Sequence, residues 1–149
     1  MTTSTTFEKR AVSFDAALEI ARAALDAGRK TNHGIAVAVV DDAGIPLVVL
    51  RTDTGTEQFV TGAIAKAWTA VNFRSSTREV FESIQSGQGD NGLLPFADKS
   101  MFLMGGAPLR DGDAVIGAIG AAGAPNGIDD DAIAQAGVQA FGAIRMAGR

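Results

Sequence analysis

The chain has 149 residues, of which 46% are hydrophobic and 20% charged, as is ordinary for one globular domain with a sizeable core. It contains no cysteine and no tyrosine, which excludes disulfides, thiolate metal sites and cysteine nucleophiles and removes a common general acid. A formal net charge of -4 without any basic run argues against nucleic acid as a partner.

The sequence also indicates where the protein resides. No stretch has the length and hydropathy of a transmembrane span, and the polar start "MTTSTTFEKRAV" lacks the apolar core of a signal peptide. We therefore expect a cytoplasmic protein that does not bind membranes. Residues 1–12 are expected to form a flexible lead-in, and residues 13–149 a single domain.

The first predicted elements are a helix and a hairpin. Ser13 is placed to cap a helix whose apolar residues recur at helical spacing and which Gly28 ends. In "GIAVAVVDDAGIPLVVLR", two β-branched runs flank residues 42–44 and predict a hairpin with a short turn. Both runs are nearly continuous in apolar residues, so we expect at least part of each strand to be covered on both faces.

The middle and the end of the chain are mainly helical. "TEQFVTGAIAKAWTAVNF" returns to helical spacing, and "STREVFESIQ" predicts a second, short helix with Thr77 as its N-cap. Residues 86–100 have the composition of a long loop, which in a compact domain is more often functional than idle. The last helix is expected to begin at Asp129 or Asp130, since acidic residues complement the positive end of a helix.

Three glycines near the end of the chain raise the question of a phosphate-binding loop. Gly117, Gly120 and Gly123 are spaced G-x-x-G-x-x-G in a strand that returns from a tight turn at Asp111-Gly112. A dinucleotide fingerprint needs G-x-G-x-x-G in a strand-to-helix turn, and the Gly-Lys-Ser/Thr ending of a P-loop is missing. We interpret these glycines as bulges or sites of close backbone approach rather than as a nucleotide cradle.

The order of elements predicts the fold class. A helix, two strands, two helices, two hairpin strands and a final helix favour an α+β domain with helices packed on an antiparallel sheet. Five motifs then follow one another along the chain: "VVDDAG", "RTD", "KAWTA", "GGAPL" and "GAIGAAG". In this order they resemble the GlcG/HbpS family, the haem-binding or "haem-degrading" domain also found at the C-terminus of PduO-type corrinoid adenosyltransferases.

The resemblance covers about residues 12–146 and carries expectations of its own. It implies a profilin-like fold with a central antiparallel sheet of about five strands flanked by helices. It also implies a homo-oligomer and the binding of haem or a related tetrapyrrole as cofactor. Members of the family occur in several metabolic contexts, so the shared fold does not settle one activity.

Mapping the family pattern onto this chain gives six polar positions: Asp41, Arg51, Asp53, Lys66, Thr69 and Thr77. Arg51 and Asp53 stand two apart on a strand or its exit, a spacing that allows an ion pair. Lys66 emerges from an apolar helix stripe, where its ammonium either joins Asp53 or binds an anionic group such as a carboxylate or a haem propionate. The alternative for Lys66 is a structural salt bridge that orients the helix on the sheet.

Candidates for contact with a haem or another ligand lie elsewhere in the chain. His33 is the only histidine and the strongest conventional iron ligand; the alternative is an exposed turn residue. Met101 and Met104 are further candidate iron ligands, although methionines at the head of a strand usually fill the core. Phe96, in the long loop, is a candidate to close over a small ligand, the alternatives being an oligomer contact or a mobile surface loop.

Two functions from different classes follow from these candidates. The leading one is a homo-oligomeric haem-binding or tetrapyrrole-binding protein that carries, buffers or senses its ligand, with Arg51, Asp53, Lys66, Thr69 and Phe96 around the ligand. The second is a cofactor-independent enzyme acting on a small carboxylated or aromatic metabolite, with Lys66, Asp53 and His33 as the catalytic set. A third interpretation is an assembly module without chemistry.

Overall fold

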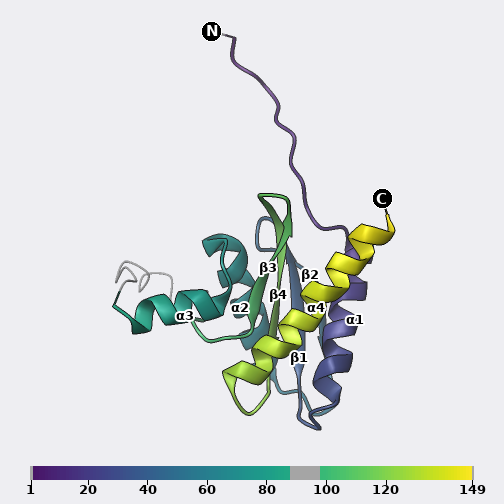
Figure 1. Ribbon diagram of the computed structural model, residues 1–149, viewed down its shortest axis with the longest axis vertical. Coiled ribbons are helices and arrows are strands. Elements are labelled where there is room, and N and C mark those ends of the chain that lie inside the picture. Colours follow the sequence, from purple (N-terminus) through teal and green to yellow (C-terminus); the bar gives the residue numbers. More distant parts are fainter. Residues whose placement is uncertain (1, 88–97, 149) are drawn as a thin grey trace.

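Four strands and four helices make up the fold in a computed structural model, which describes residues 2–87 and 98–148. In chain order they are α1 (Phe14–Arg29), β1 (Ala36–Asp41), β2 (Pro46–Arg51), α2 (Glu57–Phe73), α3 (Thr77–Gln85), β3 (Gly106–Asp111), β4 (Ala114–Ala122) and α4 (Gly127–Ala147). The strands form one antiparallel sheet in the order β2-β1-β4-β3. Helices α1 and α4 lie side by side against one face, and α2 packs on the other (Figure 1).

The predicted α+β class, with helices flanking an antiparallel sheet, is confirmed. The expected strand count of about five is slightly too high, because the described residues form four strands. The residues from 98 to 105 enter β3 without forming a further strand. In the part of the chain that the structure describes, no helix is both long enough and apolar enough to cross a membrane.

The two strands of the first hairpin differ in burial. β1 is covered on both faces: Ala36 and Ala38 pack with α2, while Val37 and Val39 face α1 and α4. β2 lies at the edge of the sheet, and Val49 is 38% exposed there. The expectation that at least part of each strand is covered on both faces holds for β1; β2 is contacted by both α1 and α2 but is covered less completely, because it lies at the edge of the sheet.

Close backbone approach explains the glycines of β4. A Cβ on Gly120 would lie 2.0 Å from the carbonyl oxygen of Ala63 in α2. Small residues on both elements thus bring the helix backbone almost onto the strand backbone. The interpretation of these glycines as sites of close backbone approach is confirmed, and the close approach at Gly120 sets how near α2 lies to β4.

Helix ends follow local capping chemistry. Ser13 caps α1 as predicted, and its side chain accepts from the N–H of Ala16. Helix α3 is capped by Ser76 rather than by Thr77, because Ser76 and Glu79 form a reciprocal capping box. Helix α4 begins at Gly127, earlier than expected, with Asn126 as its cap.

The capping box makes the stability of α3 depend on pH. Hydrogen bonds from the Ser75 hydroxyl and then from the Ser76 backbone lower the pKa of Glu79 below its ordinary value of 4.5. The carboxylate therefore contributes stability that is full above pH 4.5 and is lost as pH falls through the lower folded-state pKa. We expect Glu79→Gln to lower stability at pH 7 by less than about 1 kcal/mol, and the difference from wild type to vanish in acid.

Urea unfolding at a series of pH values from neutral to acid measures this difference. Glu82→Gln removes a carboxylate from the same helix without touching the capping box, so it should show no such pH-dependent loss. A gap between Glu79→Gln and wild type that stays constant down to the acid limit would contradict the assignment.

The last residues of the N-terminal lead-in contact the body of the fold. Val12 is buried and donates its backbone N–H to the carbonyl of Ile116 at 2.8 Å. Lys9 forms an ion pair with Asp42 at 3.1 Å in the β1–β2 turn. The flexibility expected for residues 1–12 stays a prediction.

Candidate functional site

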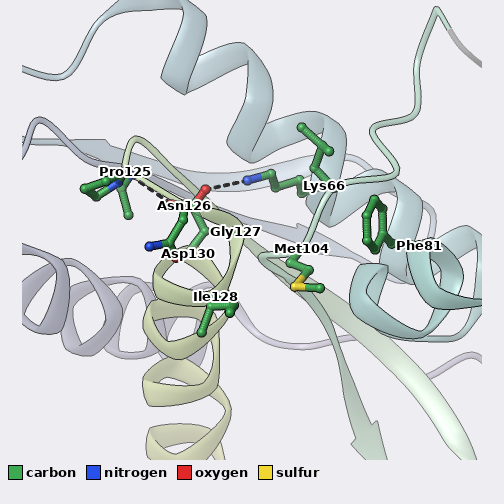
Figure 2. A pocket seen from close by; sticks show the side chains of 10 residues that line it. Lys66, Phe81, Met104, Pro125, Asn126, Gly127, Ile128 and Asp130 are labelled. Atoms are coloured by element: carbon green, nitrogen blue, oxygen red, sulfur yellow. Dashed lines mark hydrogen bonds and ion pairs between the residues drawn. The ribbon is translucent and has the colours of Figure 1, made fainter. Parts of the chain in front are cut away.

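An apolar pocket of about 470 Å³ opens where α2, α3, the segment before β3 and the start of α4 meet. We call it the apolar pocket. It is lined by Lys66, Phe81, Leu103, Met104, Ala124, Pro125, Asn126, Gly127, Ile128 and Asp130. Figure 2 shows the ion pair of Lys66 and Asp130 with three apolar side chains near it: Phe81 from α3, Met104 from the segment before β3, and Ile128 from α4. Its volume is within the range of small-molecule sites.

A buried ion pair joins two walls of the apolar pocket. Lys66 Nζ donates to Asp130 Oδ2 at 2.7 Å and to the backbone carbonyl of Ala121 at 2.9 Å (Figure 2). The side chains of Lys66 and Asp130 are only 3% and 9% exposed. The second carboxylate oxygen of Asp130 accepts from the backbone N–H of Ala124 at 2.9 Å. The pair thus ties α2, the end of β4 and the start of α4 together.

Glycine at position 105 allows this pair to close. Gly105 has a φ of +118°, in the region that other residues rarely adopt. A Cβ there would lie 2.8 Å from the Cβ of Asp130 and 3.1 Å from Lys66 Nζ. The "GG" of the "GGAPL" motif therefore lets the chain enter β3 past the ion pair.

A second ion pair lies beside the first. Arg78 Nε donates to Asp131 Oδ2 at 3.1 Å and links α3 to α4. Asp131 Oδ1 is buried and has no hydrogen-bond partner among the described residues. The acidic start of α4, expected to complement the helix dipole, therefore also supplies counter-ions to two other helices.

Met104 and Met101 have different surroundings. Met104 lines the apolar pocket and packs over the start of α4, where a Cβ on Gly127 would lie 3.1 Å from the Met104 Cβ. Met101 packs against α2, where a Cβ on Gly62 would lie 3.6 Å from the Met101 sulfur. Both methionines precede β3 rather than stand at the head of a strand. Met101 fills space, as expected, whereas Met104 contributes a thioether to the pocket wall.

His33 and Asp53 lie together in a shallow depression. We call it the His33 depression; it is lined by Arg29, Asn32, His33, Thr52, Asp53 and Thr54. His33 and Asp53 are both exposed. Since Lys66 lines the apolar pocket, the structure does not bring Lys66, Asp53 and His33 into one cavity, and the enzyme interpretation gains no support from it.

Arg51 has backbone partners instead of a carboxylate. Its guanidinium donates to the carbonyl oxygens of Thr52 at 3.0 Å and Asp53 at 3.2 Å. The ion pair that the spacing of Arg51 and Asp53 allowed is not formed. The charge cluster suggested for Lys66 and Asp53 is not formed either, because Lys66 pairs with Asp130.

Three of the family's other polar positions hold the backbone. Asp41 Oδ1 accepts two N–H groups of the turn after β1, both at 2.9 Å. Thr69 is buried, donates to the α2 backbone at 2.7 Å and accepts from Met101 N–H at 2.9 Å. Thr77 accepts from the N–H of Gly106 at 2.8 Å and so fixes α3 on β3. The hydroxyl of Thr69 is thus engaged within the fold, while Phe96 lies outside the described residues.

Asp130 is the charged residue of this site that the sequence did not single out as a site residue. It stands 64 positions from Lys66, among other acidic residues at a helix start. Nothing in the spacing marks it as the partner of Lys66. Within residues 2–87 and 98–148, no group of three or more His, Asp or Glu residues is placed to hold a metal ion.

Comparison with known proteins identifies the family. The sequence model described as "Haem degrading protein HbpS-like" matches residues 12–139. The chain belongs to this HbpS-like family. The predicted family resemblance is therefore confirmed, and the match covers α1 to most of α4.

Solved structures of HbpS-like relatives share the fold. HbpS of Streptomyces reticuli, solved as a double mutant, is 33% identical with a TM-score of 0.83, over 93% of this chain and 92% of that one. ORFY of Klebsiella pneumoniae is 26% identical with a TM-score of 0.86, over 96% and 99%. A PduOC–haem complex is 27% identical with a TM-score of 0.78, over 87% and 94%.

Proposed function

We propose that this HbpS-like chain binds haem or a closely related tetrapyrrole in the apolar pocket, and that it carries, buffers or senses that ligand as a cytoplasmic homo-oligomer. Family membership and the similarity to a chain solved in complex with haem support a haem-related role. The observation that carries the choice of site is the combination of apolar walls with a thioether in one cavity.

The residues of the apolar pocket fit a tetrapyrrole. Phe81, Leu103 and Ile128 would offer apolar surface to a flat ring system, and Met104 would offer a thioether, a group that can bind haem iron. A bound haem would supply an iron centre that takes such a ligand. Because Asp130 already neutralises Lys66, this ammonium would not be a free counter-ion for a haem propionate.

The His33 depression is the rival haem site. It contains His33, the stronger iron ligand, and Arg29, whose side chain is 63% exposed and could pair with a propionate. Its other lining residues are polar, and the depression is shallow, so the faces of a porphyrin would be left largely to water. Burial of the ring system therefore favours the apolar pocket over the His33 depression.

Titration of the purified protein with hemin, followed in the visible spectrum, tests the function and the site together. We expect a saturable, shifted Soret band. Met104→Leu, which conserves volume, should weaken binding by roughly tenfold or more, since loss of even an outer-shell partner costs a metal site that much. His33→Ala should bind hemin as wild type does.

Met146→Leu is the matched control, because this methionine on α4 is 79% exposed and lies outside the pocket lining. If His33→Ala abolishes the band while Met104→Leu keeps it, the site moves to the His33 depression. A wild-type response no different from that of an unrelated acidic protein overturns the haem-binding function itself.

A further inference from the structure

The Lys66–Asp130 ion pair, which we call the floor of the apolar pocket, contains an N–H donor without an acceptor among the described residues. An ammonium group carries three N–H donors. Among the residues that the structure describes, Lys66 Nζ has two acceptors, Asp130 Oδ2 and the carbonyl of Ala121. Lys66 also lines the pocket, and its side chain is only 3% exposed. One N–H of this buried ammonium thus remains for an acceptor in the pocket.

The charges around the floor favour a neutral acceptor over an anion. Lys66 and Asp130 form a neutral pair, and Arg78 and Asp131 form a second one beside it. Asp129 adds a further negative charge in the first turn of α4, against the positive end of that helix. An anionic ligand would bring a buried charge without a free counter-ion, whereas a carbonyl oxygen brings none.

The walls define what must carry that oxygen. Phe81, Met104 and Ile128 leave apolar surface around the ion pair, as Figure 2 shows. An apolar group fills this space without leaving polar atoms unpaired, and an oxygen on its leading edge meets the remaining donor of Lys66.

We propose that the floor of the apolar pocket is a binding site for a neutral carbonyl oxygen carried on a compact apolar or aromatic group, with Lys66 as the donor. For a tetrapyrrole the inference rests on the proposed function, and it then selects ring systems with a keto or lactam oxygen on the buried edge. For smaller ligands it needs neither iron nor haem.

Three probes of similar size separate the effects of the carbonyl oxygen, the apolar ring and a negative charge. They are acetophenone with a carbonyl, ethylbenzene without one, and benzoate with a charge. Their affinities are measured by two-dimensional ¹H–¹⁵N NMR titration of the whole chain. The decisive quantity is the ratio of the ethylbenzene Kd to the acetophenone Kd. We expect that ratio to fall by about threefold to tenfold from wild type to Lys66→Met/Asp130→Asn, the effect of one hydrogen bond. Benzoate should bind wild type no more tightly than acetophenone.

The double variant removes both charges together, and the Asn side chain keeps an acceptor for Ala124 N–H. Ile128→Ala is the matched control, since it trims an exposed apolar wall and should weaken both neutral probes without changing their ratio. An equal ratio in wild type and double variant overturns the proposal, as do shift changes that avoid the pocket residues.

A measurement on wild type alone keeps the test independent of how well the double variant folds. The C=O stretch of bound carbonyl-labelled acetophenone should lie at lower frequency than in hexane, because a hydrogen bond weakens the C=O bond. A stretch at the hexane value overturns the proposal. None of these probes contains iron, so their failure leaves the hemin result standing, and a negative hemin titration leaves theirs standing.

Discussion

Lys66→Met is expected to lower the free energy of unfolding by about 3 to 5 kcal/mol, because it leaves the Asp130 carboxylate buried without its counter-ion. The carbonyl of Ala121 also loses its side-chain donor. Urea unfolding followed by circular dichroism measures the change, provided that the slope of the transition stays that of the wild type. A loss of this size would be a large fraction of the stability of a domain of this length.

Lys66→Met/Asp130→Asn tests whether the loss comes from the orphaned charge. The double variant should regain most of the stability, since replacing both partners of a buried ion pair is far less costly than removing one. Lys9→Met supplies the comparison for an exposed pair, because the Lys9 side chain is 51% exposed, and it should cost less than about 1 kcal/mol. A Lys66→Met protein within 1 kcal/mol of wild type would show that the pair contributes little to holding α2 and α4 together.

The sequence allowed two roles for Lys66, a ligand anchor or a member of a structural ion pair, and the single and double variants test the second. In the structure Lys66 has a structural partner, so the second alternative describes the contact that exists. The first is not thereby removed, because Lys66 also lines the apolar pocket with one donor to spare. A buried polar pair at the floor of an apolar cavity can hold the fold and still meet a ligand.

Local signals in the sequence predicted the elements of the fold well. Nearly continuous apolar runs marked the first hairpin, apolar residues at helical spacing marked α1 and α2, and Asp111-Gly112 marked the second hairpin. These patterns depend on residues only a few positions apart. The helix ends were less accurate. Ser76 outcompetes Thr77 as the cap of α3 because its reciprocal bonds with Glu79 satisfy two backbone donors at once.

The site was harder to predict, because its parts meet only through the tertiary fold. The motif "KAWTA" identified Lys66, but its partner Asp130 lies in another helix, 64 positions away. The family's polar positions instead suggested Asp53, which follows β2 and lines the His33 depression. Distance along the chain says nothing about which of many carboxylates a buried ammonium will meet. That choice depends on α2 and the start of α4 both packing at the same end of β4.

Lys66 can reach Asp130 only because α2 packs close to β4, and Gly120→Ala tests this close packing. A Cβ there would lie 2.0 Å from the Ala63 carbonyl oxygen, a backbone atom that no side-chain rotation can move away. We expect a loss of about 3 kcal/mol or more in unfolding free energy, the upper range for overpacking, because α2 must shift off the sheet. Such a shift also draws Lys66 away from Ala121 and Asp130, so hemin affinity should fall with stability.

Gly142→Ala is the opposite case in the same protein. Gly142 is an exposed position inside α4 where an added Cβ meets nothing within 4 Å. Alanine there should stabilise the fold by about 0.5 to 1 kcal/mol, since it removes the helix penalty of glycine. If Gly120→Ala unfolds at the same urea concentration as wild type, α2 does not rest on β4 as closely as described. The position of Lys66 in the pocket would then need another cause than the absence of a side chain at Gly120.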